Sequence, residues 1–291
     1  MKRILILILT LSISTVANAD VKGQALSNVS GKISSIIGNL MPGDGVTEVS
    51  VEIDEDDTQF EILGVRDISS KENSNLFTQF SIHTQEVNND DRYIGNLGLG
   101  YRFLNADQSM MFGVNSFYDR DILEDHSRVS FGLEAKSSIL DFTLNKYIKT
   151  TNMLVVNNTE EQALSGLDYN ISSQVPYMPW TVFNYQGYKW ENEKAVQDTK
   201  GKVYSLEMAL SPSLQFDLSR DVSSVSGVED TDIVKLTFVY PPRENKTTLS
   251  DGFVSNLAFE KKNMKNTLKE KVRRNNNIVI EVQGSVIVTS Q

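Results

Sequence analysis

The amino-acid sequence predicts an all-β fold, a transmembrane antiparallel β-barrel of about 12 strands. Three observations carry the prediction. Segments of about ten residues alternate between apolar and polar side chains, an export signal precedes them, and the polar connections between them are alternately short and long. Alternation with a period of two places one set of side chains on each face of a strand. A membrane barrel needs such strands, because lipid surrounds its outer face and water fills its interior.

The alternation is clearest in three consecutive segments, residues 96–104, 109–121 and 127–136. On one face of the first segment the side chains are apolar, namely Leu97, Leu99, Tyr101 and Phe103. On the opposite face they are glycine, amide or charge, namely Asn96, Gly98, Gly100 and Arg102. The third segment repeats this pattern, with Phe131 opposite Gly132 and Glu134. We expect the apolar faces to meet lipid and the polar faces to line a lumen.

The barrel is expected to comprise residues 46–240. Its candidate strands are Thr47–Asp54, Gln59–Val65, Leu76–His83, Tyr93–Leu104, Met110–Tyr118, Arg128–Lys136, Asp141–Ile148, Ala163–Ser172, Trp180–Tyr188, Lys202–Leu210, Leu214–Arg220 and Ile233–Tyr240. The second and ninth candidates alternate less regularly than the others.

The connections between these strands indicate how the barrel is oriented. Those after the fourth, sixth and tenth strands are expected to be short, and the one after the eighth contains two prolines. Longer polar connections are expected after the third, fifth, seventh, ninth and eleventh strands, at residues 84–92, 119–127, 149–162, 189–201 and 221–232. Outer-membrane barrels have tight periplasmic turns and longer external loops. Both ends of the barrel should therefore lie on the periplasmic side.

The N-terminus carries the export signal. Lys2 and Arg3 precede an apolar run too short to cross a membrane as a helix, and Ala17-Asn18-Ala19 matches a cleavage site, so residues 1–19 are predicted to be a signal peptide. Residues 20–45 form a periplasmic lead-in, which fits either a short amphipathic helix or a loosely ordered tail. The chain contains no cysteine, which excludes disulfides and thiolate metal sites.

Basic residues are concentrated after the last predicted strand. Residues 241–275 contain nine Lys or Arg against four Asp or Glu, although the whole chain has a net charge of −10. Pro241 and Pro242 end the strand because neither can donate a backbone hydrogen bond. The segment that follows is long enough to cross a bilayer, and an acidic barrel would attract it. We predict a linker threaded through the lumen or folded near it; a solvated periplasmic tail is the alternative.

The expected contacts of this linker are between charges. Acids on the predicted lumen faces are candidates to hold it, namely Glu134, Asp168 and Glu207. The linker cations expected near them are Lys261, Lys262 and Lys265. Such attractions are screened less inside a low-dielectric wall than in open water.

Catalytic, metal and nucleic-acid sites are not expected. The two histidines are His83, near a strand end, and His126, in a loop between Asp125 and Ser127. Sequence neighbours in a loop rarely form the triad of a serine hydrolase. Acidic clusters at residues 54–57 and 88–91 have the oxygen ligands that Ca²⁺ prefers, but we interpret them as hydrated loop charges. An exported protein meets no obvious nucleic acid, so the basic run of residues 261–274 is not interpreted as a nucleic-acid site. No cofactor is expected, and the protein is not expected to be an enzyme.

Several motifs resemble those of the inverse autotransporter family, of the intimin/invasin type. NLGLGYRF at residues 96–103, GVNSFYDRD at 113–121 and FGLEA at 131–135 resemble its most recognisable strands, in the same order. Residues 274–281 resemble the short strand that follows the family's pore-threading linker. Weaker counterparts are residues 51–56, 76–79 and 165–168. The signature positions are Asn96, Gly98, Gly100, Gly113, Asn115, Phe117, Tyr118, Asp119, Gly132 and Glu134.

The resemblance implies an outer-membrane barrel in a Gram-negative-type cell, which anchors and exports its own C-terminal segment and is linked to adhesion. The partners that it implies are outer-membrane lipids, the barrel-assembly machinery and periplasmic chaperones; it identifies no receptor. Only 17 residues follow Arg274, too few for a passenger domain with its own core, so residues 276–291 are expected to be a rudimentary passenger start. A small-solute channel is the alternative function.

Overall fold

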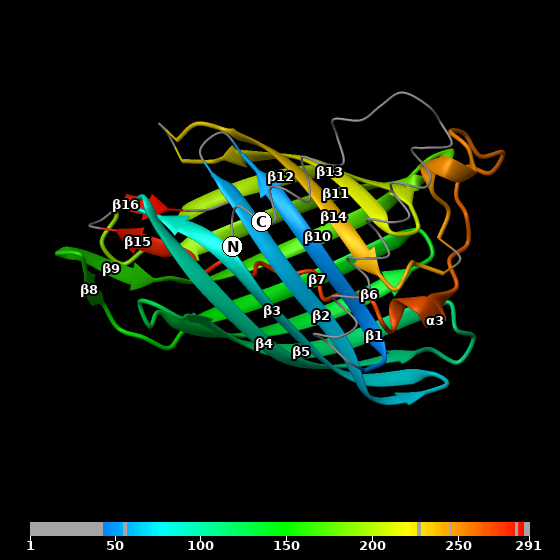
Figure 1. The fold of residues 1–291 in the computed structure, drawn as a ribbon, viewed down its shortest axis with the longest axis horizontal. Helices are drawn as coiled ribbons and strands as arrows, with labels where there is room; N and C mark the ends of the chain where they lie inside the picture. Colours follow the sequence, from blue (N-terminus) through cyan, green and yellow to red (C-terminus); the bar gives the residue numbers. More distant parts are fainter. Residues whose placement is uncertain (1–42, 55–56, 226–227, 245, 283–284, 288–291) are drawn as a thin grey trace, which may run out of the picture. The chain divides into compact units, whose positions relative to one another are not determined.

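The computed structural model describes residues 43–54, 57–225, 228–244, 246–282 and 285–287. Within these residues, twelve antiparallel strands close into one barrel and four short strands form a second sheet (Figure 1). The predicted signal peptide lies outside the described residues, as does the lead-in except for residues 43–45. Among the described residues no helix is long and apolar enough to cross a membrane.

The barrel strands follow one another in chain order around the wall. They are β1 (Gly45–Ile53), β2 (Thr58–Lys71), β3 (Ser74–Val87), β4 (Asp90–Leu104), β5 (Met110–Asp121), β6 (Ser127–Ser137), β7 (Leu140–Lys149), β10 (Ser165–Val175), β11 (Met178–Glu191), β12 (Thr199–Ser211), β13 (Leu214–Ser223) and β14 (Thr231–Tyr240). β14 pairs with β1 and closes the ring, with Val49 opposite Phe238. The predicted all-β barrel and its strand count are confirmed.

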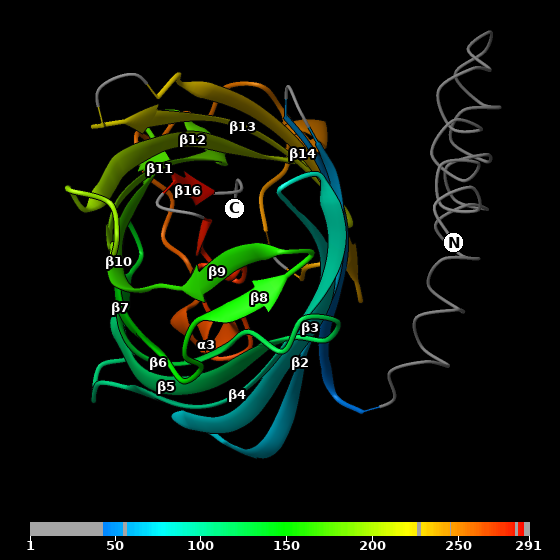
Figure 2. The same cartoon turned by 90° about the vertical axis from the view of Figure 1, so that its left-hand side faces the viewer.

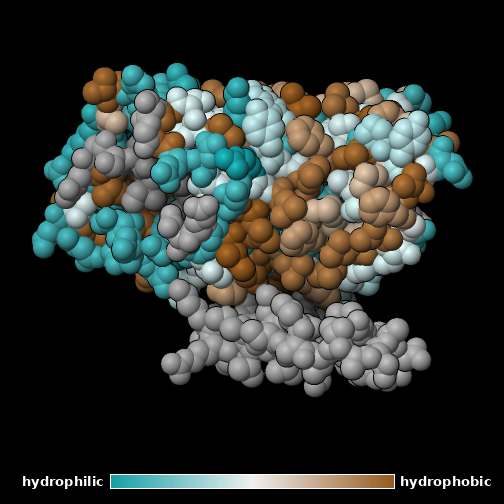
Figure 3. Space-filling view, turned by 90° about the horizontal axis from the view of Figure 1, so that it is seen from above, coloured by the Kyte–Doolittle hydropathy of each residue, from teal (hydrophilic) through white to brown (hydrophobic). Residues whose placement is uncertain are grey.

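Side chains alternate between the two faces of the wall as the sequence predicts. On β4, Leu97 and Leu99 are 60% and 57% exposed, whereas Asn96 is 5% and Arg102 0% exposed. Figure 3 shows hydrophobic side chains gathered over the middle and right-hand part of the outer wall, and hydrophilic residues covering the left-hand end. The outer face of the barrel is therefore the apolar one, as lipid requires.

The two rims of the barrel differ. The rim where the chain enters β1 and leaves β14, here called the short-turn rim, has connections of residues 72–73, 105–109, 138–139, 176–177 and 212–213. The opposite rim, the long-loop rim, has connections of residues 54–57, 88–89, 122–126, 150–164, 192–198 and 224–230. The difference agrees with the predicted orientation, in which the short-turn rim is periplasmic.

One expectation for the long-loop rim was wrong. The connection after the third strand is not a long loop, because β3 and β4 continue to a tight turn at Asn88 and Asn89, both with positive φ. Asparagine tolerates that conformation. Where β3 and β4 extend past the bilayer they need no apolar outer face, so alternation in the sequence does not reveal the extra length. The connection after β7 contains a hairpin, β8 (Leu154–Val156) and β9 (Thr159–Ala163).

After Tyr240 the chain runs along the short-turn rim and then crosses the lumen. It passes the 3₁₀ turn η1 (Leu249–Asp251) and the one-turn helix α3 (Met264–Thr267), which lie at the short-turn end (Figure 1). It then runs through the barrel to β15 (Ile280–Val282) and β16 (Ser285–Ile287), where β15 pairs with β9 (Figure 2). The predicted linker through the lumen is confirmed.

A charge on the outer face should destabilise the barrel. Replacing Leu99 by Arg places a cation in the exposed apolar row of β4, and we expect the free energy of unfolding in lipid vesicles to fall by about 2–4 kcal/mol. The measurement is denaturant unfolding followed by the gel mobility of unboiled samples. Leu99→Met is the matched control and should cost less than about 1.5 kcal/mol. Equal stability of the two variants would show that Leu99 does not face lipid.

Candidate functional site

The candidate site is the barrel lumen together with the chain that occupies it, residues 268–282. At the short-turn rim this chain begins at an apolar contact, in which Leu268 and Met264 pack against Leu104 and Met111 at the start of the β4–β5 wall. This apolar contact holds the chain at the point where it enters the lumen.

Arg102 on β4 binds the linker where it enters. Its guanidinium forms a bidentate pair with Glu134 of β6, at 3.1 Å from Nε to Oε1 and 2.8 Å from Nη2 to Oε2. Its remaining nitrogen, Nη1, donates to the carbonyl oxygens of Leu268 at 3.3 Å and of Glu270. The carboxylate thus holds the guanidinium in place, and the guanidinium holds the backbone of the linker.

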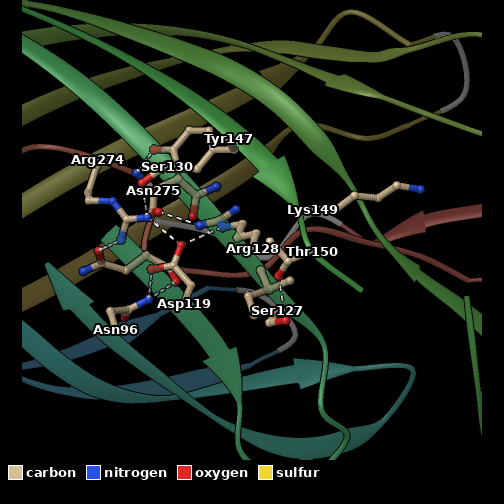
Figure 4. Close-up of polar contacts among 12 residues, drawn as sticks. Asn96, Asp119, Ser127, Arg128, Ser130, Tyr147, Lys149, Thr150, Arg274 and Asn275 are labelled. Atoms are coloured by element: carbon tan, nitrogen blue, oxygen red, sulfur yellow. Dashed lines mark hydrogen bonds and ion pairs between the residues drawn. The ribbon is translucent and has the colours of Figure 1, made fainter. Parts of the chain in front are cut away.

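Asp119 on β5 is the centre of a buried ion cluster along the linker. It accepts hydrogen bonds from Arg128 Nε at 2.7 Å, from Arg274 Nη2 of the linker at 2.6 Å and from Asn96 Nδ2 at 2.7 Å (Figure 4). The side chains of Asp119, Arg128 and Arg274 are all 0% exposed. One wall carboxylate therefore joins a wall cation to a linker cation.

Glycines on the lumen face make room for aromatic rings beneath the arginines. A Cβ atom on Gly98 would lie 2.3 Å from the Phe117 ring, and one on Gly100 would lie 2.3 Å from the Phe77 ring. The Arg274 guanidinium lies over Phe117 at 4.3 Å, and the Arg102 guanidinium lies over Phe77 at 4.4 Å. In both places the glycine admits the ring, and the cation–π contact with the ring takes the place of water around the guanidinium.

Asp168 on β10 forms a second acidic centre, without a direct cation partner among the described contacts. It accepts from Asn145 Nδ2 at 2.6 Å and from the Tyr147 hydroxyl at 2.7 Å. The same tyrosine hydroxyl accepts the backbone N–H of Asn275 at 2.8 Å, and Asn145 Nδ2 also donates to the carbonyl of Arg273 at 3.1 Å. Asp168 therefore orients two wall groups that bind linker backbone.

Further along the linker, wall amides and one guanidinium hydrogen-bond its backbone. These bonds are Val272 N to Gln79 Oε1 at 2.7 Å, Arg128 Nη2 to Asn275 O at 2.7 Å, Asn96 Nδ2 to Asn276 O at 3.0 Å, and both polar groups of Ile278 to Gln85 at 3.0 and 2.8 Å. Over this stretch the described linker residues pair with no strand, so side chains of the wall bind the backbone N–H and C=O groups that a neighbouring strand would otherwise bind. Backbone contacts do not depend on linker side chains.

The remaining linker charges pair with acids and a lysine of the wall. Lys271 contacts Glu48 at 2.6 Å, Lys269 contacts Asp67 at 2.7 Å, Lys136 contacts Glu270 at 2.8 Å, and Arg273 forms a bidentate pair with Glu207. Beside them lies a cavity of about 140 Å³, lined by Glu52, Glu61, Asp217 and Lys235 among others. A cavity of this size has room for several water molecules beside the linker.

At the long-loop rim the linker joins the second sheet. Ile280 pairs with Ala163 and Val282 with Glu161, so β15 extends the β8–β9 hairpin. Glu161 is itself bound to the barrel, through Arg92 at 2.6 Å and His126 at 3.2 Å. Burial raises the pKa of Glu161, but its bonds to His126 and Arg92 outweigh this effect and lower that pKa overall. The hairpin that receives the linker is therefore anchored by a buried charge cluster.

A loop from another part of the wall also binds β15. The Glu281 carboxylate, 2% exposed, accepts the backbone N–H groups of Glu193 at 3.0 Å, Lys194 at 3.1 Å and Ala195 at 2.7 Å. These residues belong to the connection between β11 and β12. Three N–H donors that converge on one carboxylate form an anion-binding nest, and the Glu281 side chain of β15 occupies this nest.

The predicted acids face the lumen, but the predicted cations do not lie near them. Glu134, Asp168 and Glu207 all face the lumen. The expectation that Lys261, Lys262 and Lys265 lie near them was wrong. Lys261 is exposed, Lys262 contacts Asp141 at 3.5 Å, and Lys265 contacts Glu72 at 3.2 Å, all before the chain enters the lumen. The chain first follows the rim, so the cations that reach the acids are Lys271, Arg273 and Arg274.

The signature positions divide between the two faces of the wall. Tyr118 is 42% exposed on the outer face. The other nine face the lumen, namely Asn96, Gly98, Gly100, Gly113, Asn115, Phe117, Asp119, Gly132 and Glu134. Among the described residues, no group of three or more His, Asp or Glu side chains is arranged to hold a metal ion.

Comparisons with known proteins agree with this geometry. The family model of the inverse autotransporter β-domain matches residues 10–276. An attaching and effacing protein homolog of Escherichia coli K12 is 27% identical over 166 residues, 55% of this chain and 52% of that protein. The inverse autotransporter adhesin YeeJ of the same strain is 25% identical over 284 residues, 92% of this chain and 11% of the adhesin. The chain thus spans about half of one relative and about a tenth of the other.

A solved structure has the same fold. It comes from a study of the in-meso crystallisation of membrane proteins and superposes with a TM-score of 0.67 at 18% sequence identity. The match covers 82% of this chain and 99% of that chain.

Removing the Asp119 charge should destabilise the lumen. Asp119→Asn leaves Arg128 and Arg274 buried without a carboxylate between them, and we expect the free energy of unfolding in detergent to fall by about 3–5 kcal/mol. The matched control is Asp125→Asn, which breaks an exposed pair with Arg120 and should cost at most about 1 kcal/mol. Urea unfolding measures both. A loss no greater than that of the control would refute the role of the Asp119 cluster.

Proposed function

The chain belongs to the inverse autotransporter β-domain family, and on that premise we propose that it is a translocator, which anchors and exports the C-terminal segment of its own chain to the cell surface. Its localisation is the outer membrane, and its immediate environment is lipid. The proposed mechanism is geometric, and we propose no catalytic role for any residue.

One observation carries the proposal. The chain leaves the barrel at the short-turn rim, re-enters the lumen at α3 and reaches the long-loop rim, where β15 pairs with β9. Since outer-membrane barrels have their longer loops outside, a chain on this route passes from the periplasmic side to the external side. Residues 285–287 then pair with β15 at that rim.

The lumen contacts suit a chain that is first moved and then held. Wall amides bind linker backbone at Val272 and Ile278, contacts that segments of other sequence would also make on their way through. The charge pairs with Lys271, Arg273 and Arg274 are specific to the linker, so they favour its final position. We propose that the backbone contacts line the route of the moving chain and that the charge pairs stop the chain in its final position.

Assembly and adhesion follow as further proposals. Unpaired strand edges are not tolerated in the hydrocarbon region, so we propose that the barrel-assembly machinery and periplasmic chaperones protect them while the barrel inserts. One relative is named an adhesin. We propose that this chain contributes to adhesion by presenting β15 and β16 at the surface.

The C-terminal end of the chain should be found outside the cell. An epitope tag placed after Gln291 is expected to bind antibody on intact cells, because β15 and β16 lie at the long-loop rim. The control is a tag inserted in the short turn between residues 105 and 109, which should bind only after the outer membrane is permeabilised. Labelling of the C-terminal tag only in permeabilised cells would contradict export.

Removing the linker should open the barrel. A chain ending at Pro242 lacks the segment that fills the lumen, so its conductance in planar bilayers should exceed that of the full chain severalfold. The unboiled gel mobility of the truncated barrel shows that it has folded. The alternative function, a small-solute channel, needs the opposite result, in which the full chain conducts as well as the truncated one.

A further inference from the structure

A cluster of apolar side chains is exposed at the short-turn rim. It belongs to residues 253–259, here called the rim segment, in which Phe253 is 63%, Val254 67%, Leu257 62% and Phe259 38% exposed. Neighbouring apolar residues that together point away from a protein usually mark a surface that contacts a partner or a membrane.

The backbone of the rim segment is fixed to the barrel. Trp180 Nε1 donates to the carbonyl of Phe253 at 3.0 Å, and the two rings lie 5.5 Å apart. The turn between β10 and β11 makes two further bonds, from Ser255 N to Tyr177 O at 2.8 Å and from Tyr177 N to Ala258 O at 2.9 Å. The polar groups of the segment therefore meet the rim, and its apolar side chains are left on the outside.

The exposed cluster continues the lipid-facing surface of the barrel. Tyr177, to which the segment is bonded, is 51% exposed. Ile139 in the next turn and Leu140 at the start of β7 are 41% and 52% exposed. Leu140 begins the outer apolar row of β7, which continues to Phe142 and Leu144. In Figure 3 the hydrophobic surface extends toward this end of the barrel and away from the end that carries β8 and β9.

We propose that the rim segment docks in the periplasmic leaflet of the outer membrane and that its partner is phospholipid. Aromatic and apolar side chains at the edge of a barrel lie at the level of the headgroups and upper acyl chains. Lys261, exposed two residues after the cluster, supplies a cation for the headgroup phosphates. Docking here fixes the linker outside the lumen, just before it turns inward at α3. The proposal needs the barrel in its membrane but does not require export.

Spin labelling tests the proposal, because the chain has no cysteine and each new one is unique. Val254→Cys and Leu257→Cys carry a nitroxide in vesicles of phosphatidylethanolamine and phosphatidylglycerol. Leu97→Cys on the outer wall is the lipid standard, and Val155→Cys on β8, 70% exposed, is the aqueous standard. The readout is the ratio of collisions with oxygen, which enters lipid, to collisions with a water-soluble nickel chelate.

The rim labels should give a ratio severalfold above that of the Val155 label and close to that of the Leu97 label. Adding Leu257→Asp to the Val254→Cys protein should lower the ratio, whereas adding Ser109→Asp in another turn of the same rim should not. A ratio equal to the aqueous standard would overturn the proposal. So would low collision rates with both reagents, which would mean that a second copy of the chain covers the segment.

Discussion

Backbone hydrogen bonding without water is the constraint on which the rest of this structure depends. Lipid offers no partner for an unpaired N–H or C=O, so the wall must close, and β14 completes the ring against β1 from Thr47 to Ile53. Closure creates a lumen whose lining faces no lipid and therefore carries amides, acids and arginines. These groups need partners as well. The linker supplies partners to several of them, and a cavity of about 140 Å³ remains beside it.

The arginine side chains in the lumen need space as well as electrostatic attraction to the acids. Gly98 and Gly100 remove the Cβ atoms that would meet Phe117 and Phe77, and those rings lie beneath Arg274 and Arg102. The glycines of the β4 motif therefore act indirectly, through the aromatic rings that they admit. A larger residue at either position would displace the ring and with it the guanidinium that binds or belongs to the linker.

Much of the fold, and less of the site, could be predicted from the sequence. Period-two alternation marks any strand with lipid on one side, so the wall and its acids, such as Glu134, were placed correctly. The predicted linker cations were wrong because no periodicity in the sequence shows where an extended chain enters a lumen. Lys265 lies at the rim, and Arg273 is the residue that contacts Glu207. The nest around Glu281 had no signal, since its donors are backbone N–H groups.

The register of the linker follows from alternation of the kind that identifies the strands. Successive residues of an extended chain point to opposite sides, and here Arg273 reaches Glu207 on β12 whereas Arg274 reaches Asp119 on β5. A slip by one residue would turn each cation toward the other wall, and one of the two carboxylates, Glu207 or Asp119, would lose its linker cation. Buried ion pairs add little net stability compared with apolar packing, but a buried charge without a partner is costly. We infer that these pairs serve chiefly to stop the chain at one position, with β15 beside β9.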